Sequence, residues 1–383
     1  MGFQRYKKYS SPLYNYTFDR VTGKFVRWGK TKEDDPKYSI AGPEIADIEI
    51  STACSKGCAY CYKSNMKYGT YMTNDNYKRI LNTINANDTL TQVALGIGDI
   101  DSNPELEKIL ITTRELGLVP NITINGTKMN DYYYDLLVKY CGAVSISRYN
   151  DEEMINVAKE LKARSKNNKS STLKNINIHA ILCKDTYNSI FKFIKENFVE
   201  CKLGYNLSDI FDAIVFLSLK PIGNRNIYTE GNDYQSDTKL DYSVSDEDYK
   251  KLIDYVLNYS VPIGFDSCGC YKFLNSIRDH EHYKYISTFA EPCESTLFSI
   301  YVNVNGNIYP CSFCEHSLKF INVMKKYTKS NNIPEVVNLL EEDMDFTNDV
   351  WYSEMFKVFR KIVLSTEQSN DIHCRTCPIF GVL

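Results

Sequence analysis

Apolar positions along the chain follow two periods, one of two residues and one of three to four residues. From residue 46 to residue 50, Ala46, Ile48 and Ile50 alternate with polar side chains, which predicts a β-strand. The same signals predict further strands over residues 90–96, 119–124, 143–147, 175–182 and 213–219. Helical periodicity predicts helices over residues 73–85, 103–117, 131–140, 151–164, 187–197 and 245–259. Thr73 suits an N-cap, and Pro104 suits the first helical position.

Strands and helices therefore alternate six times between about residues 46 and 260, and one more strand is expected over residues 261–265. Such alternation is typical of an α/β fold with parallel strands and right-handed crossovers. Six units are fewer than the eight that close a complete (β/α)8 barrel. A loop with one helical turn is expected over residues 203–212, and an exposed excursion over residues 223–244.

The alternation is absent from both ends of the chain, which predicts three domains. Residues 1–44 form an N-terminal extension, in which the segments 14–18 and 24–28 flank a turn as in a β-hairpin. Residues 45–265 carry the strand–helix units. Residues 266–383 are rich in cysteine and contain Asn305-Gly306, a strong hairpin signal, so they predict a small cysteine-rich domain of β-hairpin and helix.

Composition narrows the classes of protein to which the chain can belong. The 383 residues suffice for two domains and a large core, and the net charge of −3 gives no global basic field for nucleic acid. The first residues lack the apolar stretch of a secretory signal, and no apolar run reaches the ~20 residues of a membrane helix. The 13 cysteines of a chain expected to be cytoplasmic indicate metal ligation rather than disulfides.

Three of these cysteines form a C-x3-C-x2-C triplet directly after the first predicted strand, at Cys54, Cys58 and Cys61. A cluster that only carries electrons normally takes four cysteines, so three thiolates leave one iron open to an outside ligand. A zinc knuckle needs four Cys or His ligands, and the first histidine of the chain is His179. A disulfide framework is disfavoured by the odd number of closely spaced cysteines.

The triplet resembles the C-x3-C-x-aromatic-C signature of the radical S-adenosylmethionine (SAM) superfamily, with Tyr60 in the aromatic position near the adenine. The resemblance implies that a [4Fe–4S] cluster binds SAM at its open iron and cleaves it to a 5'-deoxyadenosyl radical. It also implies a partial (β/α)6, TIM-like barrel with its chemistry at the C-terminal strand ends, where the cysteine loop lies. A flavodoxin or ferredoxin is the usual reductant in this family.

Four predicted strand ends resemble SAM-binding segments of the same family, at residues 96–99, 123–126, 145–148 and 217–223. The glycines allow backbone to approach a ligand closely. The cofactor-binding residues that the resemblance implies, beside Tyr60, are Gly96, Gly98, Asp99, Asn125, Ser145, Ser147, Arg148 and Leu219. A simple turn is the alternative for the first segment. For Arg148 the alternatives are a bond to the SAM carboxylate and a surface salt bridge.

A second cysteine pattern lies in the C-terminal region. Cys293-x12-Gly306-x4-Cys311, followed by Cys374-x2-Cys377, resembles the auxiliary-cluster domains of SPASM and Twitch type. This resemblance implies one auxiliary [4Fe–4S] cluster held by Cys293, Cys311, Cys374 and Cys377. The alternative is a zinc ribbon from Cys311-x2-Cys314 and Cys374-x2-Cys377, although its gap is far longer than the usual ~15–20 residues.

The remaining cysteines and His179 have simpler expected roles. Cys268 and Cys270 follow the last predicted strand, so they are candidate catalytic hydrogen-atom donors to a substrate radical; incidental buried thiols are the alternative. Three other cysteines are expected to be packing residues, namely Cys141, Cys183 and Cys201. His179 lies inside a predicted apolar strand and is expected to be an interior histidine rather than a base.

The working hypothesis is a radical SAM enzyme that modifies a peptide or protein by cross-linking, oxidation or epimerisation. The first alternative is a radical SAM dehydrogenase or isomerase that acts on a small molecule or nucleotide. The second is a non-catalytic metal-binding module, which would need a fourth protein ligand at the triplet. No peptide-recognition domain is evident in residues 1–44, but the hairpin there could add a substrate strand at its edge.

Overall fold

The computed structural model describes residues 4–59, 61–223, 243–329, 335–367, 372 and 374–383. These residues fall into two compact units, each assembled from segments that are distant in sequence. Unit 1 comprises Met1–Ser55, Met66–Ile176 and Glu294–Lys361, and unit 2 comprises Lys56–Asn65, Asn177–Cys293 and Ile362–Leu383. The expected boundaries after residues 44 and 265 stay predictions.

Unit 1 is built on a mainly parallel sheet with the strand order β7-β6-β5-β4-β11-β12. The strands are β4 (Ile45–Glu49), β5 (Gln92–Gly96), β6 (Val119–Ile124), β7 (Ala143–Ser147), β11 (Ser299–Val302) and β12 (Ile308–Tyr309). The hairpin signal at Asn305-Gly306 is confirmed, because β11 and β12 pair antiparallel and Gly306 has a φ of 85°. The sequence pattern did not predict that β11 also pairs with β4, in parallel register.

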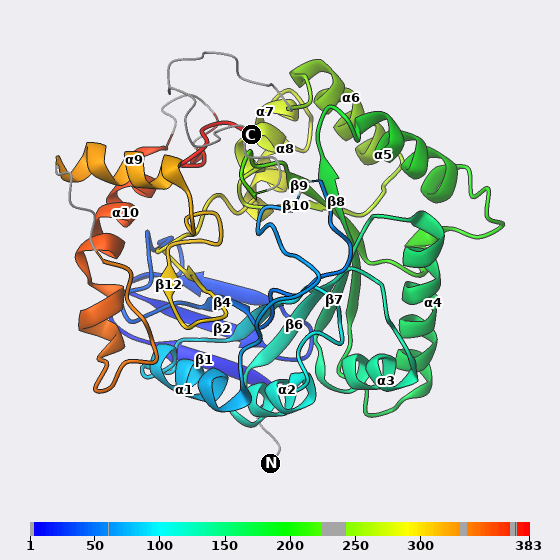
Figure 1. Cartoon of the computed structure of the whole chain (residues 1–383). Helices are drawn as coiled ribbons and strands as arrows, with labels where there is room; N and C mark the ends of the chain where they lie inside the picture. Colours follow the sequence, from blue (N-terminus) through cyan, green and yellow to red (C-terminus); the bar gives the residue numbers. More distant parts are fainter. Residues whose placement is uncertain (1–3, 60, 224–242, 330–334, 368–371, 373) are drawn as a thin grey trace. The chain divides into compact units, whose positions relative to one another are not determined.

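Unit 1 also contains several helical segments. They are α1 (Asn74–Ile84), α2 (Leu106–Glu115), α3 (Asp131–Tyr140), α4 (Asp151–Asn167), α9 (Leu318–Thr328), the π-helix η5 (Phe346–Trp351) and most of α10 (Glu354–Ser365). Figure 1 shows α1, α2 and α3 side by side along one face of the sheet. The Thr73 hydroxyl caps α1 as predicted, by accepting a hydrogen bond from the Asn76 amide at 3.3 Å.

The start of α2 differs from the prediction of a helix that begins at Pro104. The helix begins two residues later, at Leu106. The Asn103 side chain donates to the carbonyl oxygens of Ile50 and Met72, and its own oxygen accepts from the Glu105 amide at 2.9 Å. These bonds hold residues 103–105 as a turn, so Pro104 precedes the helix.

The N-terminal segment of unit 1 forms a separate antiparallel sheet with the order β1-β2-β3. Its strands are β1 (Tyr6–Ser10), β2 (Asn15–Asp19) and β3 (Phe25–Trp28). The predicted pairing of the second and third strands is therefore confirmed, and β1 is an addition that the pattern did not reveal. The central strand is anchored by aromatic side chains, since Tyr14, Tyr16 and Phe18 are fully buried.

Unit 2 contains a parallel sheet with the order β10-β9-β8. Its strands are β8 (Asn175–Leu182), β9 (Ala213–Ser218) and β10 (Ile263–Phe265). Its helical segments are α5 (Tyr187–Ile194), η1 (Lys195–Val199), η2 (Leu207–Asp209), α6 (Asp246–Asn258), α7 (Cys270–Ser276), α8 (Tyr283–Ile286) and η4 (Ser287–Phe289). The short helix η2 confirms the expected helical turn within residues 203–212, whereas most of the predicted excursion 223–244 lies outside the described residues.

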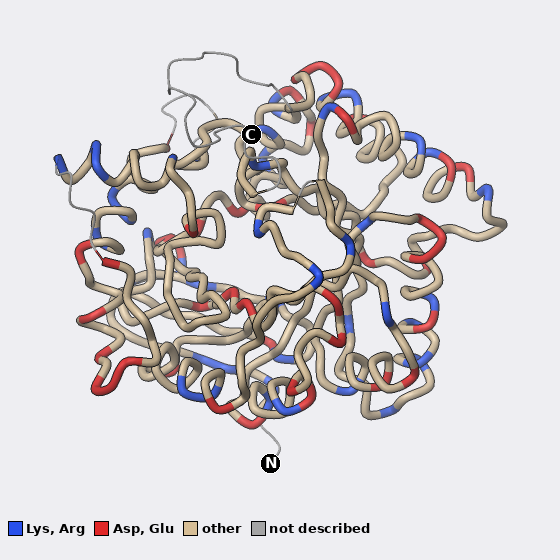
Figure 2. Tube along the Cα trace, in the orientation of Figure 1, with Lys and Arg blue, Asp and Glu red and all other residues tan. Residues whose placement is uncertain are grey.

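All six strands predicted from the alternation are present, and the α/β class is confirmed. Basic and acidic residues are interspersed along the helices, as Figure 2 shows, in keeping with the near-neutral net charge of −3. Among the described helices, none combines the length and the apolar composition that a membrane span requires.

Candidate active site and thiol clusters

The first site begins where the chain leaves β4 and enters the cysteine loop. Within unit 1, the Cys54 amide donates to the Met66 carbonyl oxygen at 2.7 Å, and the Ala53 amide donates to the Ser51 hydroxyl at 3.2 Å. These bonds tie the start of the loop to a later segment of the same unit. The loop therefore holds Cys54 at the C-terminal end of a parallel strand, where α/β enzymes place their chemistry.

Gly98 packs directly against this loop. The Asp99 amide donates to the Ala53 carbonyl oxygen at 3.0 Å. A Cβ atom at position 98 would lie 2.0 Å from that oxygen and 2.7 Å from the Cβ atom of Cys54. Gly96 is less constrained, because its added Cβ atom would meet Glu49 at an ordinary 3.5 Å. The glycine at position 98 is thus required by the close approach of two backbones.

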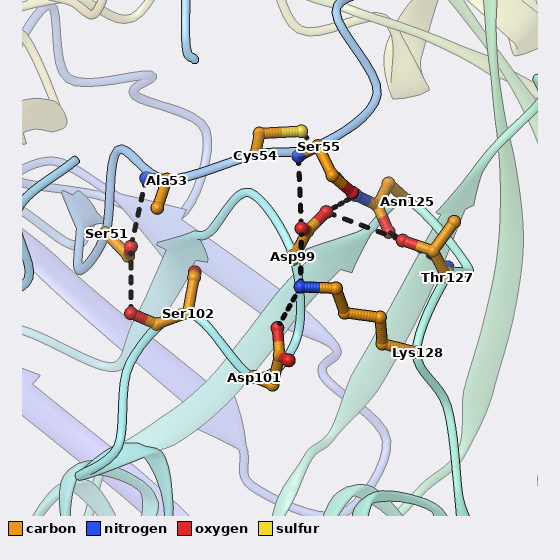
Figure 3. Close-up of polar contacts among 10 residues, drawn as sticks. All are labelled: Ser51, Ala53, Cys54, Ser55, Asp99, Asp101, Ser102, Asn125, Thr127 and Lys128. Atoms are coloured by element: carbon orange, nitrogen blue, oxygen red, sulfur yellow. Dashed lines mark hydrogen bonds and ion pairs between the residues drawn. The ribbon is translucent and has the colours of Figure 1, made fainter. Parts of the chain in front are cut away.

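Asp99 is the centre of a polar network around Cys54, shown in Figure 3. Its carboxylate accepts from the Asn125 amide at 2.8 Å and from the Ser55 backbone amide at 3.0 Å, and it pairs with the Lys128 ammonium at 3.0 Å. Burial alone would raise the pKa of Asp99, but the hydrogen bonds from Lys128, Ser55 and Asn125 outweigh it and lower the pKa to about 2. Asp99 is therefore ionised at neutral pH.

Asn125 connects this network to the cluster loop. Its Nδ2 atom lies 3.6 Å from the Cys54 sulfur, to which it donates. Its Oδ1 atom accepts from the backbone amide and the hydroxyl of Thr127, at 2.9 Å and 2.6 Å, which fixes the orientation of the side-chain amide. Hydrogen bonds to a ligating sulfur tune the electronic properties of a cluster.

Sequence reasoning found Asp99 and Asn125 but missed Thr127 and Lys128. Both missed residues directly follow the segment 123–126 that had been singled out. A polar pair immediately after a Gly that ends a parallel strand was the available signal, because Gly126 with its φ of 81° turns the chain back toward the site.

The other residues predicted to bind SAM have varied positions. Ser145 and Ser147 lie on β7, whose C-terminal end belongs to unit 1. The Arg148 guanidinium pairs with Asp151 of α4, with Nε–Oδ1 at 2.8 Å and Nη2–Oδ2 at 3.1 Å. Leu219 directly follows β9 of unit 2 and is half-buried. Tyr60 lies outside the described residues.

Cys58 and Cys61 belong to unit 2, because the unit boundary crosses the cysteine loop after Ser55. The Cys61 amide donates to the Cys58 carbonyl oxygen at 3.2 Å, and the Asn65 amide donates to the Cys61 sulfur at 3.4 Å. Gly223, with a φ of 65°, approaches this turn so closely that a Cβ atom would lie 2.2 Å from the Cys61 carbonyl oxygen. The segment 217–223 therefore packs on the turn formed by Cys58 and Cys61 through Gly223, which was not among the predicted SAM-binding residues.

Five buried or half-buried cysteines of unit 2 gather in a second site, here named the five-thiol cluster: Cys268, Cys270, Cys293, Cys374 and Cys377. The Cys374 sulfur lies 3.4 Å from the Cys270 sulfur. Cys268 and Cys377 form a second hydrogen-bonded pair, and Cys293 interacts electrostatically with Cys377. The segments 268–270 and 374–377 therefore bring their thiols together in two pairs.

The thiol pairs differ from ordinary buried cysteines in their electrostatics. The hydrogen bond to Cys377 lowers the pKa of Cys268; burial opposes this effect, and the Lys220 ammonium supports it. In the other pair, the hydrogen bond to Cys374 and burial raise the pKa of Cys270. One thiol of each pair is thus predisposed to ionise, and the thiolate is the form that ligates metal.

Lys220 is a cation that interacts with Cys268. It is 5% exposed and pairs with Asp266, which also accepts hydrogen bonds from Ser218 and from the Gly269 amide. Burial lowers the pKa of Lys220, but the Cys268 thiol and Asp266 outweigh it and raise the pKa. His179 of β8 is half-buried, and burial lowers its pKa to about 4.

The remaining C-terminal cysteines lie in unit 1. Cys311, a predicted auxiliary ligand, has its sulfur 3.5 Å from that of Cys314. Cys141 and Cys183 are buried, as expected of packing residues, and Cys201 is half-buried. Within the described part of the chain, no three Cys, His, Asp or Glu side chains converge on a ready-made position for a metal ion. The donor chemistry still fits iron–sulfur clusters, because thiolates are the groups that hold them.

Comparison with known proteins agrees with this chemistry. The radical SAM superfamily matches residues 48–150, which include the cysteine triplet and the Asp99 network. The iron–sulfur cluster-binding domain named SPASM matches residues 293–378. Cys268 and Cys270 precede the second match. No match was found among curated proteins.

Solved structures show the same fold. SuiB of Streptococcus suis bound to its precursor peptide SuiA is similar with a TM-score of 0.63 at 14% identity, covering 98% of this chain and 99% of that chain. SuiB bound to S-adenosylmethionine gives a TM-score of 0.58 at 18% identity, covering 88% and 72%. Histidine-tagged anSMEcpe with bound AdoMet gives a TM-score of 0.50 at 16% identity, covering 84% and 83%.

These likenesses confirm the TIM-like α/β fold with a C-terminal cysteine-rich domain. SAM and iron–sulfur clusters are the cofactors of the two matched domains, and the matched ranges contain cysteines, the residue type that holds such clusters. Residues 48–150 of the chain therefore carry a radical SAM domain, and residues 293–378 carry a SPASM-type iron–sulfur cluster-binding domain.

Proposed function

We propose that the chain modifies a peptide by radical chemistry that depends on the cysteine loop carrying Cys54, Cys58 and Cys61. The observation that supports this most directly is the network in which Asp99 and Asn125 hold the Cys54 end of the three-thiol loop. The bound cluster and SAM supply the 5'-deoxyadenosyl radical that abstracts a substrate hydrogen. Everything else in the mechanism is positioning by the protein.

The residues of unit 1 have distinct tasks in this proposal. Asn125 donates to the Cys54 sulfur and so stabilises its negative charge. Asp99 remains ionised, orients the Asn125 amide and holds the Ser55 backbone amide. Lys128 balances the Asp99 charge, with a second contact to Asp101 at 3.0 Å. Gly98 lets the two backbones approach, which keeps the loop close to this network.

A peptide is the proposed substrate because a structural similarity that extends over 98% of this chain is to a protein solved with its precursor peptide. The identity of 14% supports the fold alone, so the substrate class is an inference. The proposed outcome is an oxidation or cross-link, with a flavodoxin or ferredoxin as the reductant. The alternative substrate is a small molecule, and the substrate assay described below distinguishes the two substrate classes.

We further assign the auxiliary cluster to the five-thiol cluster, with Cys268, Cys270, Cys374 and Cys377 as ligands. Two of these four are in the set that the sequence implied, while Cys268 and Cys270 replace Cys293 and Cys311. The paired sulfurs, the 3.4 Å separation of Cys270 and Cys374, and the nearby Lys220 support this assignment. It competes with the role of Cys268 and Cys270 as hydrogen-atom donors.

Iron and sulfide analysis of separate Ala variants distinguishes these assignments. Cys268→Ala combined with Cys270→Ala is expected to remove about half of the iron of the reconstituted chain, if each of two sites holds one cluster. Cys311→Ala is expected to leave the iron content unchanged. The reverse pattern would return the ligand set to the one implied by the sequence. Unchanged iron content together with loss of product in the variant that combines Cys268→Ala and Cys270→Ala would support hydrogen-atom donation by these thiols.

Electron paramagnetic resonance of the reduced, reconstituted chain tests the first site. The wild type should show two cluster signals, one of which shifts when SAM is added. A Cys54/Cys58/Cys61→Ala variant should keep only the signal that SAM leaves unchanged, and Cys201→Ala should behave as the wild type. A spectrum that SAM does not alter would contradict the open-iron site.

The substrate assay uses the same reconstituted chain with SAM and a chemical reductant. We expect 5'-deoxyadenosine to form, and short peptides encoded beside the gene to lose hydrogen, as read by mass spectrometry. Formation of 5'-deoxyadenosine without change to any such peptide, but with turnover of a small molecule, would shift the proposal to the small-molecule alternative.

A further inference from the structure

The sheet of unit 1 has an apolar face and a polar face, and one acidic residue stands out on the polar one. Along β4, Ala46 and Ile48 are buried, whereas Asp47 between them is exposed. Strand register places the neighbours of Asp47 on the same face, since paired residues of adjacent strands point the same way. Across the sheet this row consists of Tyr309, Tyr301, Asp47, Ala94, Asn121 and Ala143.

The carboxylate of Asp47 has no protein partner among the residues that the structure describes, unlike the other acidic groups near this row. Glu49 accepts from the Val304 amide at 3.2 Å, and Glu315 accepts from the Tyr301 hydroxyl at 3.2 Å and from Asn303 at 2.6 Å. In the same described part of the chain, no group donates a hydrogen bond to Asp47 or forms an ion pair with it. An exposed carboxylate without such partners is available to a ligand.

The surroundings of Asp47 would strengthen the binding of a positive charge. No charged group of the described residues perturbs the ionisation of Asp47. The Asn121 amide donates to Gln92 Oε1 at 2.8 Å, and neither side chain brings a charge. An incoming cation would therefore meet a carboxylate whose charge no neighbouring side chain compensates.

The neighbours in register also fit a long side chain with a charged end. Ala94 on one side is small and half-buried, and Tyr301 on the other side is buried. Lysine and arginine bury their methylene stems on such surfaces while the charged group stays at a polar site. A metal ion is a poor alternative, because the described residues place no second and third ligand beside this carboxylate.

We propose that Asp47 binds a cationic group of the substrate, namely the ammonium or guanidinium of a lysine or arginine side chain in the peptide. This inference rests on the proposed function and adds a specificity-determining residue to it. Asp47 lies on the same strand that leads into the cysteine loop, seven residues before Cys54. A side chain held there would fix the register of the peptide relative to that loop.

The test uses two fluorescein-labelled synthetic peptide libraries that differ only at a central fixed position. One library carries lysine there, and the other carries norleucine, its uncharged counterpart. Fluorescence anisotropy with the reconstituted, SAM-loaded chain is expected to show at least about tenfold tighter binding of the lysine library, which corresponds to about 1.4 kcal/mol. Equal binding of both libraries, or binding of neither, would overturn the inference.

Variants then assign the preference to Asp47. Asp47→Asn is expected to reduce the lysine preference to within about twofold, and Asp47→Lys to favour a matching glutamate library. Glu115→Gln, which removes an exposed carboxylate at the end of α2, is the matched control and should keep the wild-type preference. A preference that persists in Asp47→Asn would contradict the assignment.

A measurement on the wild-type chain tests the proposal without relying on variants that must fold. A water-soluble carbodiimide joins a carboxylate to an amine only when the two are in contact, and the lysine library should be coupled to Asp47, as mapped by mass spectrometry. Coupling only at other carboxylates would overturn the proposal. Formation of 5'-deoxyadenosine is measured in parallel without peptide: its absence means that the proposed function has failed, whereas its presence without coupling at Asp47 means that only this inference has failed.

Discussion

The network around Cys54 and the five-thiol cluster hold cysteines in two different ways. In unit 1, a single cysteine is framed by groups that are not metal ligands, with Asp99 and Asn125 fixed by hydrogen bonds of 2.8–3.0 Å. In unit 2, thiols contact one another, and two pairs form between segments more than 90 residues apart. The first site is organised by hydrogen bonds from groups other than thiols, whereas in the second the thiols contact one another.

This difference has an electrostatic origin. Asp99 and Lys128 carry opposite charges and compensate each other at a site where the lysine is 46% exposed. The cation of the five-thiol cluster, Lys220, is almost fully buried, and its partner Asp266 is mostly buried. A buried pair is costly to break, because the remaining charge cannot recover its hydration. Charge changes in the second region should therefore cost more stability than in the first.

Lys220→Met is expected to have the largest effect on stability. It leaves the Asp266 carboxylate buried without its cation, which typically costs about 3–5 kcal/mol. Lys128→Met is the matched change in the other region, and we expect it to cost at most about 1 kcal/mol because Lys128 is partly exposed. Anaerobic urea unfolding of the reconstituted variants measures both. Similar costs for the two lysines would remove the electrostatic difference between the regions.

Gly98→Ala is expected to disturb the first site without affecting the second. The added methyl group would overlap the Ala53 carbonyl oxygen and displace the cysteine loop, at a cost of about 1–3 kcal/mol. The SAM-sensitive resonance signal should be lost or altered, while the other cluster signal persists. Gly96→Ala, whose methyl group meets Glu49 at 3.5 Å, is the control and should retain both signals. Loss of both signals in Gly98→Ala would indicate that the sites are not independent.

Asp99→Asn tests whether the polar network frames Cys54. The pKa of Asp99 is lowered to about 2, so its stabilising effect is complete above the unfolded-state value of about 3.9 and is lost only as pH falls through that value toward 2. We expect the variant to be less stable by about 2 kcal/mol, with a constant difference between pH 6 and pH 9. Urea unfolding across this range measures it. A difference that varies with pH in this range would mean that Asp99 is not ionised as described.

The sequence pattern was most informative for local structure. The sequence pattern predicted β6, β7 and β8 with the bounds that the structure has. In β8, and over most of β6, buried and less buried positions alternate, whereas the centre of β7 is buried throughout. The hairpin at Asn305-Gly306 was equally local. The parallel pairing of β11 with β4 was not predictable in this way, since it joins residues about 250 positions apart and leaves no periodic mark in either strand.

The same distinction explains which site residues were found. Asp99 and Asn125 lie at the ends of predicted strands within segments that resemble a family motif. Lys128 contacts Asp99 only because two strand ends lie close together in the folded structure. The Cys268–Cys377 pair likewise joins segments that are more than 100 residues apart in the sequence. Spacing along the chain suggested Cys311 as an auxiliary ligand and did not reveal the contact between Cys270 and Cys374.

Arg148→Gln should have the smallest effect of these changes. It tests whether a residue at a strand end that does not contact the Cys54 network contributes to SAM binding. The guanidinium is engaged by Asp151, whose side chain is 44% exposed, so the pair contributes at most about 1 kcal/mol. SAM affinity, measured by equilibrium dialysis of the reconstituted chain, should change less than about twofold, which corresponds to about 0.4 kcal/mol. Asp151→Asn serves as the matched control, because it removes the same ion pair and leaves the cation. A tenfold loss of SAM affinity in Arg148→Gln alone would show that the arginine leaves Asp151 to bind the cofactor carboxylate.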